Sequence, residues 1–218
     1  MGFNVVCISR TLAAGGEVIG QAVAQRLGYR YVDEEIVTKA AQKAQVDPHI
    51  VAAAEHKRPL LQRLLDALAS AQGLADPMAT ASGLPLEFFY QPAPLQPRAT
   101  PDDLRALIRA TIIEVASAGD AVIVAHAASM ALAGHESVLR VLVTASPETR
   151  ARRMAAGEGI SESDAGVAVA ASDRERRDYF RQFYKLKEEQ PTRYDIVLNT
   201  DVLTPEQTVS LIVAAVQG

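Results

Sequence analysis

Short runs of apolar residues alternate along this chain with longer stretches in which apolar positions recur every three or four residues. The short runs, which we expect to be β-strands, cover residues 5–8, 30–32, 121–125, 138–143 and 196–198. Between the first two, helical spacing extends from Ile19 to Leu27, and Gly28 marks its end. This alternation is typical of a parallel sheet covered by helices, so the pattern predicts an α/β fold with about five parallel strands.

Three helix starts carry a recognisable signal, a capping residue followed by proline. The pairs are Asp47-Pro48, Thr100-Pro101 and Thr204-Pro205. Proline fits the first helical position because its fixed φ suits a helix and its missing N–H is not needed there. The third pair continues with Glu206 and Gln207, which completes a capping box and predicts the start of the final helix.

The stretch at about 73–100 interrupts the alternation. It contains five prolines and an aromatic cluster at residues 88–90. We expect a long irregular insertion, and insertions of this length often bind substrates or partners. The alternative is a flexible insertion whose aromatic side chains only cover an apolar patch.

The turn that joins the first strand to the first helix, residues 10–17, has the pattern of a phosphate-binding loop. In a nucleoside triphosphate-binding P-loop, backbone N–H groups surround the phosphates, a lysine reaches the terminal phosphates, and a serine or threonine holds magnesium. Here Gly16 stands in the lysine's place and Glu17 in the hydroxyl's. The sequence therefore predicts a phosphate site without these two side chains, which leaves open whether the protein transfers phosphate or only binds it.

Composition narrows the function classes. With 218 residues, 49% of them hydrophobic, the chain is long enough for one sizeable domain spanning residues 1–218. A net charge of −4 argues against nucleic acid or an anionic membrane as the main partner. The most apolar span, 121–134, is too short to cross a bilayer, and Cys7 has no second cysteine with which to form an internal disulfide. We expect a cytoplasmic protein that binds a nucleotide or other phosphorylated small molecule.

Four segments, in the same order, resemble the cytidylate kinase-like family, a branch of the P-loop nucleoside monophosphate kinases. They are Ile-Ser-Arg at 8–10 with Gly-Gly at 15–16, Tyr-Arg-Tyr-Val-Asp-Glu-Glu at 29–35, the arginine-rich run at 173–184, and Tyr-Asp-Ile-Val-Leu-Asn-Thr at 194–200. The resemblance covers nearly the whole chain outside the proline-rich insertion. It implies a three-layer P-loop NTPase-type fold, ATP and Mg²⁺ as cofactors, and transfer of the ATP γ-phosphate to a pyrimidine monophosphate such as CMP. A homo-oligomer is compatible with it.

The resemblance also implies which residues hold the donor nucleotide. The phosphates of ATP would lie against Arg10, Gly15, Gly16 and Glu17. Because Ala13 and Ala14 precede Gly15, the loop lacks a glycine where the backbone approaches phosphate. If the missing charges are not compensated, the chain is instead a catalytically impaired relative with a sensing or partner-binding role.

Acceptor contacts are expected at the ends of the second and third strands. By the resemblance, Asp33 orients the acceptor or magnesium, and Glu35 is a second candidate. His126 follows the third strand, where ligands bind in open parallel sheets, and it replaces an arginine of the family pattern. The alternative is a packed histidine without a ligand. The position of Asp33 also suits a shikimate kinase-like enzyme, and no protein metal cluster is expected.

The arginine-rich run suggests a helical lid at about 157–190. Arg174, Arg177 and Arg181 lie at i, i+3 and i+7, so a helix presents them on one face, as the catalytic lid arginines of monophosphate kinases are presented to the transferred phosphoryl group. The alternative is a solvated face with salt bridges to Asp173 and Asp178.

A second group of arginines follows the pair Ser146-Pro147. Arg150, Arg152 and Arg153 are expected to form an ordinary exposed helix face. We therefore assign them no part in the predicted phosphate site.

Overall fold

A five-stranded parallel sheet forms the centre of the molecule. The computed structural model describes residues 2–45, 100–125 and 127–218. The strands are β1 (Val5–Arg10), β2 (Arg30–Val32), β3 (Ala121–Val124), β4 (Val138–Thr144) and β5 (Ile196–Asn199). Their order across the sheet is β2-β3-β1-β4-β5, and all four neighbouring pairs are parallel. This confirms the predicted α/β class and all five predicted strands, whose ends agree within two residues.

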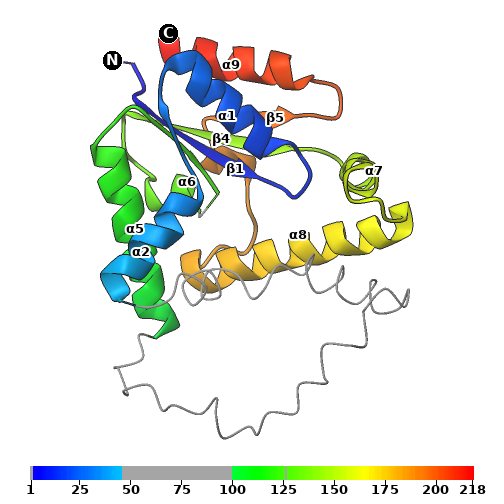
Figure 1. Cartoon of the computed structure of the whole chain (residues 1–218), viewed down its shortest axis with the longest axis horizontal. Coiled ribbons are helices and arrows are strands. Elements are labelled where there is room, and N and C mark those ends of the chain that lie inside the picture. Colours follow the sequence, from blue (N-terminus) through cyan, green and yellow to red (C-terminus); the bar gives the residue numbers. More distant parts are fainter. Residues whose placement is uncertain (1, 46–99, 126) are drawn as a thin grey trace, which may run out of the picture.

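The helices cover the sheet on both faces (Figure 1). They are α1 (Gly16–Leu27), α2 (Glu34–Ala44), α5 (Pro101–Ser117), α6 (Ala128–Ala131), α7 (Pro147–Glu158), α8 (Glu162–Tyr184), the 3₁₀ turn η3 (Pro191–Arg193) and α9 (Pro205–Gln217). Thr100 and Thr204 both form the capping boxes that stabilise helix starts. The start expected at residue 47 and the proline-rich insertion up to residue 99 lie outside the described residues. None of the described helices has the length and apolar character needed to span a membrane.

Alternation along the strands builds two apolar cores. In β1, Val5 and Cys7 face α2, α5 and α6, whereas Val6 and Ile8 face α1 and α9. The fold is therefore the expected three-layer arrangement. Cys7 is a buried small hydrophobe, and burial raises the pKa of its thiol to about 12.

Helices α7 and α8 pair to form a third, smaller apolar cluster beside the sheet. Its buried members are Ala151 and Met154 of α7 and Ala165, Ala168 and Val169 of α8. Two residues of the loop after β1, at positions 12 and 13, pack against it. The pair of helices, which we call the α7–α8 hairpin, therefore lies directly against the predicted phosphate loop.

Candidate functional site

The loop from Arg10 to Glu17 joins β1 to α1 at the carboxyl end of the sheet. Gly15 precedes the helix with φ +85°, and Ala13 also has a positive φ, of 60°. A left-handed backbone costs a non-glycine residue about 1–2 kcal/mol. Ala13 therefore has a backbone conformation that glycine adopts more easily, in the part of the loop where the sequence lacks a glycine.

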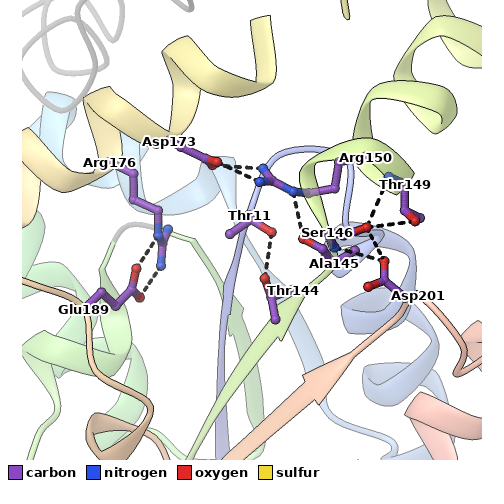
Figure 2. A network of polar contacts seen from close by, with 10 residues as sticks. All are labelled: Thr11, Thr144, Ala145, Ser146, Thr149, Arg150, Asp173, Arg176, Glu189 and Asp201. Atoms are coloured by element: carbon purple, nitrogen blue, oxygen red, sulfur yellow. Dashed lines mark hydrogen bonds and ion pairs between the residues drawn. The ribbon is translucent and has the colours of Figure 1, made fainter. Parts of the chain in front are cut away.

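Threonine hydroxyl groups at the carboxyl ends of the neighbouring strands hold this loop. Thr11 Oγ1 donates to Thr144 Oγ1 at 3.4 Å, at the end of β4 (Figure 2). Thr200 Oγ1, just after β5, donates to the carbonyl oxygen of Ala14 at 3.0 Å and accepts from Arg153 Nη1 at 3.0 Å. The carboxyl ends of β1, β4 and β5 are thus tied to one loop.

Arg10, at the end of β1, lies across the start of α1. Its Nε atom is 2.5 Å from Glu17 Oε1 in an ion pair, although this N–H is not aligned for a hydrogen bond. A Cβ atom added to Gly16 would lie 2.6 Å from the Cβ of Arg10, so the two residues are in direct contact. The sequence prediction placed Arg10, Gly15, Gly16 and Glu17 together, and the structure brings all four to the same turn.

A second part of the site lies at the end of β2. Tyr31 Oη donates to Asp33 Oδ2 at 3.2 Å. Burial, followed by the negative charges of Asp33 and Glu17, raises the pKa of Tyr31 to about 12, whereas Arg10 acts in the opposite direction. The Tyr31 ring packs against α1, since a Cβ atom added to Gly20 would lie 3.3 Å from its Cε2. Tyr31 therefore links Asp33 to the helix that follows the phosphate loop, and its hydroxyl is within electrostatic range of Arg10 and Glu17.

Glu35, the second acidic candidate, is held by surface cations. Its Oε1 is 2.6 Å from Lys39 Nζ and accepts from Arg30 Nη1 at 3.1 Å. The hydrogen bond from Lys39 and the two positive charges lower the pKa of Glu35. His126 lies outside the described residues, so its predicted substrate contact stays a prediction.

An arginine that the sequence reasoning missed connects α8 to the loop. Arg176 Nη1 donates to the carbonyl oxygen of Arg10 at 3.0 Å, and its Nη2 donates to Ser9 Oγ at 2.9 Å. Glu189 accepts two hydrogen bonds from Arg176, at 2.7 and 2.6 Å (Figure 2). Tyr194 also donates to Glu189, and burial together with this carboxylate raises the pKa of its hydroxyl. The network holds the carboxyl end of β1 in place.

Arg150 is a second arginine whose position differs from the expectation. Only 3% of its side chain is exposed, and it forms two hydrogen bonds with Asp173 of α8, at 2.9 and 2.7 Å. Its Nε donates to the carbonyl oxygen of Ala145 at 3.0 Å (Figure 2). The predicted exposed face is therefore wrong for Arg150, because position 150 faces α8 and Asp173 neutralises its charge there. Arg152 and Arg153 are exposed as expected, but Arg153 also donates hydrogen bonds to the hydroxyl and carbonyl oxygens of Thr200, which contacts the loop.

The three arginines predicted to act in a lid, Arg174, Arg177 and Arg181, are exposed on α8. At 3.6 residues per turn they lie roughly 100–160° around the helix from Arg176, the arginine that contacts the loop. Asp173, the alternative partner for Arg177, is paired within the α7–α8 hairpin. A role for the three arginines in phosphoryl transfer stays a prediction.

The fold is of the P-loop type, and the turn that follows β1 lacks the lysine that is usual in proteins of this fold. The comparisons with known proteins are consistent with this fold and more specific. The model of the cytidylate kinase-like family matches residues 5–202, and the chain belongs to that family.

Two relatives carry the name cytidylate kinase. The protein from Pyrococcus horikoshii is 27% identical over 139 residues, which are 64% of this chain and 69% of that protein. The protein from Sulfolobus acidocaldarius is 29% identical over 80 residues, 37% of this chain and 44% of that protein. The chain and these relatives thus share part of their length at modest identity.

Solved structures with the same fold are more distant in sequence. An uncharacterised protein from Eubacterium ventriosum has a TM-score of 0.64 at 13% identity, covering 98% of both chains. A sugar kinase from Janibacter has a TM-score of 0.52 at 14% identity, covering 99% of this chain and 95% of that one. Shikimate kinase from Bacteroides thetaiotaomicron has a TM-score of 0.50 at 12% identity, covering 98% of both chains. At these identities the likeness shows the shared fold alone.

Proposed function

We propose that this protein transfers the γ-phosphate of ATP to a pyrimidine monophosphate such as CMP. The observation that carries the proposal is the hydrogen bond that Asp33 accepts from Tyr31, whose ring packs against α1, so that this carboxylate is linked to the helix that follows the phosphate loop. A carboxylate that orients an acceptor and a loop that holds a donor must lie side by side for phosphoryl transfer. Membership of the family supports the reaction class, and the names of the two relatives support the pyrimidine acceptor.

The donor half of the site would bind the phosphates of ATP. The turn before α1 and the first N–H groups of that helix provide the donors and the positive end of the helix dipole, and Arg10 adds a full positive charge. In the described part of the chain no group of three or more histidine, cysteine, aspartate or glutamate side chains is positioned to hold a metal. Mg²⁺ commonly uses one or two carboxylates together with substrate phosphates, so Asp33 would be the residue that holds a nucleotide-bound ion. Such an ion would neutralise part of the phosphate charge.

The acceptor half would be arranged around Asp33. Its carboxylate at the end of β2 is the group that would orient the acceptor, and Glu35 in the first turn of α2 is a second candidate. The exposed arginines Arg174, Arg177 and Arg181 would reach the transferred phosphoryl group only through a movement of α8. Phosphoryl transfer depends mainly on positioning and charge neutralisation, which is what these side chains offer.

A specific observation supports the second candidate, a nucleotide-binding relative with little catalytic activity. The lysine and hydroxyl positions of the loop hold Gly16 and Glu17, and Glu17 neutralises the positive charge that Arg10 brings to the turn. Loss of one preorganised donor commonly costs about 3–4 kcal/mol of transition-state stabilisation, or roughly 10²–10³-fold in rate. If nothing compensates for these losses, the protein binds nucleotide with little turnover.

An ADP-release assay with MgATP separates these functions. We expect turnover with CMP, dCMP or UMP, and little with shikimate. Asp33→Asn should lower kcat by about 10²–10³-fold, the effect of removing a positioned charge from such a site, without a matching loss of stability. Glu34→Gln, an exposed carboxylate next to Asp33 in the sequence, is the matched control and should be neutral.

Two results would overturn the assignment. Wild-type turnover that survives Asp33→Asn unchanged would remove Asp33 from the site. ATP binding without turnover on any of these acceptors would instead favour the binding protein.

A further inference from the structure

In the phosphate loop, one glycine and the cationic residue stand at each other's positions when the sequence is compared with the P-loop pattern. The P-loop pattern is G-x-x-x-x-G-K-[ST]. When Gly15 is placed at its second glycine, the first glycine falls at Arg10 and the lysine at Gly16. A long cationic side chain therefore stands where the pattern has glycine, and glycine stands where it has the cation.

These two positions touch each other in the structure. A Cβ atom on Gly16 would lie 2.6 Å from Arg10 Cβ, 3.0 Å from its Cγ and 3.1 Å from its Cδ. The whole aliphatic stem of Arg10 thus crosses the place where a side chain of residue 16 would begin. Gly16 is the first residue of α1 and has no positive φ, so its backbone does not require glycine. A side chain at position 16 would therefore have to displace Arg10.

The contact also fixes where the charge of Arg10 lies. Its side chain is 27% exposed, and the Nε atom lies against Glu17 Oε1, at the pattern's Ser/Thr position. At the backbone of the same residue, Arg176 Nη1 donates to the carbonyl oxygen of Arg10 at 3.0 Å. The backbone and the side chain of Arg10 are therefore both held in place at the start of the turn.

We infer that Arg10 performs the phosphate-contacting role of the missing P-loop lysine, reaching the donor's phosphates from the end of β1 rather than from α1. The inference rests on the proposed function. A guanidinium group is always charged and offers paired N–H donors that match two phosphate oxygens. Glu17 pairs with the Arg10 guanidinium until a polyphosphate displaces it, so Glu17 competes with the ligand for Arg10.

The test measures binding of inorganic tripolyphosphate by calorimetry, without metal, so that only the protein's own groups contribute. Arg10→Met keeps most of the stem and removes the charge, and it should weaken binding at least tenfold, as expected for loss of a charge-assisted contact. Gly16→Ala adds one methyl group and should weaken binding to a similar extent, because it displaces the Arg10 stem. Glu17→Gln removes the competitor of an exposed pair and should tighten binding by about two- to fivefold.

The decisive variant is the exchange Arg10→Gly/Gly16→Lys. It restores the general pattern and should bind tripolyphosphate at least tenfold more tightly than Arg10→Gly alone, as expected when one charged phosphate contact is regained. Gly166→Ala, a helical glycine with no atom within 4 Å of an added Cβ, is the matched control for Gly16→Ala and should leave binding unchanged. Circular dichroism checks that each variant is folded.

The outcomes separate this inference from the proposed function. If wild type binds neither tripolyphosphate nor MgATP, both are overturned. If wild type binds and Arg10→Met binds equally well, only the role of Arg10 is overturned. An exchange variant no better than Arg10→Gly alone also overturns it, and if Gly16→Ala does not fold, Arg10→Met and the exchange decide the question.

Discussion

Removal of one charge from the Arg150–Asp173 pair should destabilise the protein strongly, although the pair joins two helices that lie beside the sheet. Arg150 is 3% exposed and Asp173 is 24% exposed, and two hydrogen bonds of 2.9 and 2.7 Å join them. Asp173→Asn leaves the buried guanidinium without its counter-charge, whereas the Ala145 carbonyl still accepts from its Nε. Breaking a buried pair costs about 3–5 kcal/mol, and the partial exposure of Asp173 favours the lower end, about 3 kcal/mol.

Urea and thermal unfolding measure this cost. For a chain of this size 1 kcal/mol corresponds to about 2–4 °C, so Asp173→Asn should lower Tm by about 6–12 °C. The double variant Arg150→Met/Asp173→Leu should be less destabilised than Asp173→Asn, because it leaves no unpaired buried charge. Glu206→Gln, which breaks the exposed pair with Arg26, is the control and should change Tm little. A Tm for Asp173→Asn within error of this control, or a double variant less stable than the single one, would refute the reasoning.

Three further predictions follow from contacts elsewhere in the fold. Gly20→Ala should cost about 1–3 kcal/mol in urea unfolding, because its Cβ would lie 2.6 Å from Val124 Cγ2 and α1 would have to move off the sheet. Burial alone would raise the pKa of Asp195, but hydrogen bonds from Arg140 outweigh it and hold the pKa below its ordinary value of 3.8. The stabilisation is present above that value and lost as pH falls through the lowered pKa, so wild type should lose more stability than Asp195→Asn between about pH 5 and pH 3. Glu189→Gln removes the counter-charge of Arg176 and should speed amide hydrogen exchange in residues 10–14, measured by mass spectrometry.

Matched variants serve as controls for two of these predictions. Gly166→Ala meets no neighbour and should stabilise α8 by up to about 1 kcal/mol, so destabilisation by both alanines would contradict the packing argument for Gly20. Glu188→Gln changes an exposed carboxylate next to Glu189 and should leave exchange in the loop unchanged. Equal exchange in both glutamine variants would show that Glu189 does not hold the loop.

Local signals account for the parts of the fold that the sequence predicted well. Apolar runs bounded by polar residues indicated all five strands, and a threonine followed by proline indicated the starts of α5 and α9. These features depend on neighbours within a few positions, and both capping boxes are present at Thr100 and Thr204. The turn at Gly15 and Gly16 was equally visible, because a glycine pair between a strand and a helix is typical of a tight backbone turn.

The arginines were harder to predict because their roles depend on tertiary packing. In a helix rich in arginine, periodicity shows which side chains share a face but not which face meets the rest of the protein. The sequence therefore favoured Arg174, Arg177 and Arg181, whereas the contact with the loop is made by Arg176, in the same run. Arg150 was expected to be solvated because its partner lies 23 positions away, on a different helix. Only the fold shows that each of these two arginines has a carboxylate partner, Glu189 for Arg176 and Asp173 for Arg150.

The apolar contact between the loop and the α7–α8 hairpin has a thermodynamic consequence. Leu12 and Ala13 belong to the same cluster as Met154 and Val169, so the hairpin cannot separate from the sheet without exposing part of the loop to water. Linkage makes such a coupling reciprocal. If opening of the hairpin lowers the affinity for a polyphosphate by a given factor, binding of the polyphosphate lowers the ratio of open to closed hairpins by the same factor. Ligand binding at the loop should therefore be detectable in the hairpin. Protection of the hairpin amides from hydrogen exchange should rise with ligand concentration, even without direct contact between the helical cluster and the ligand.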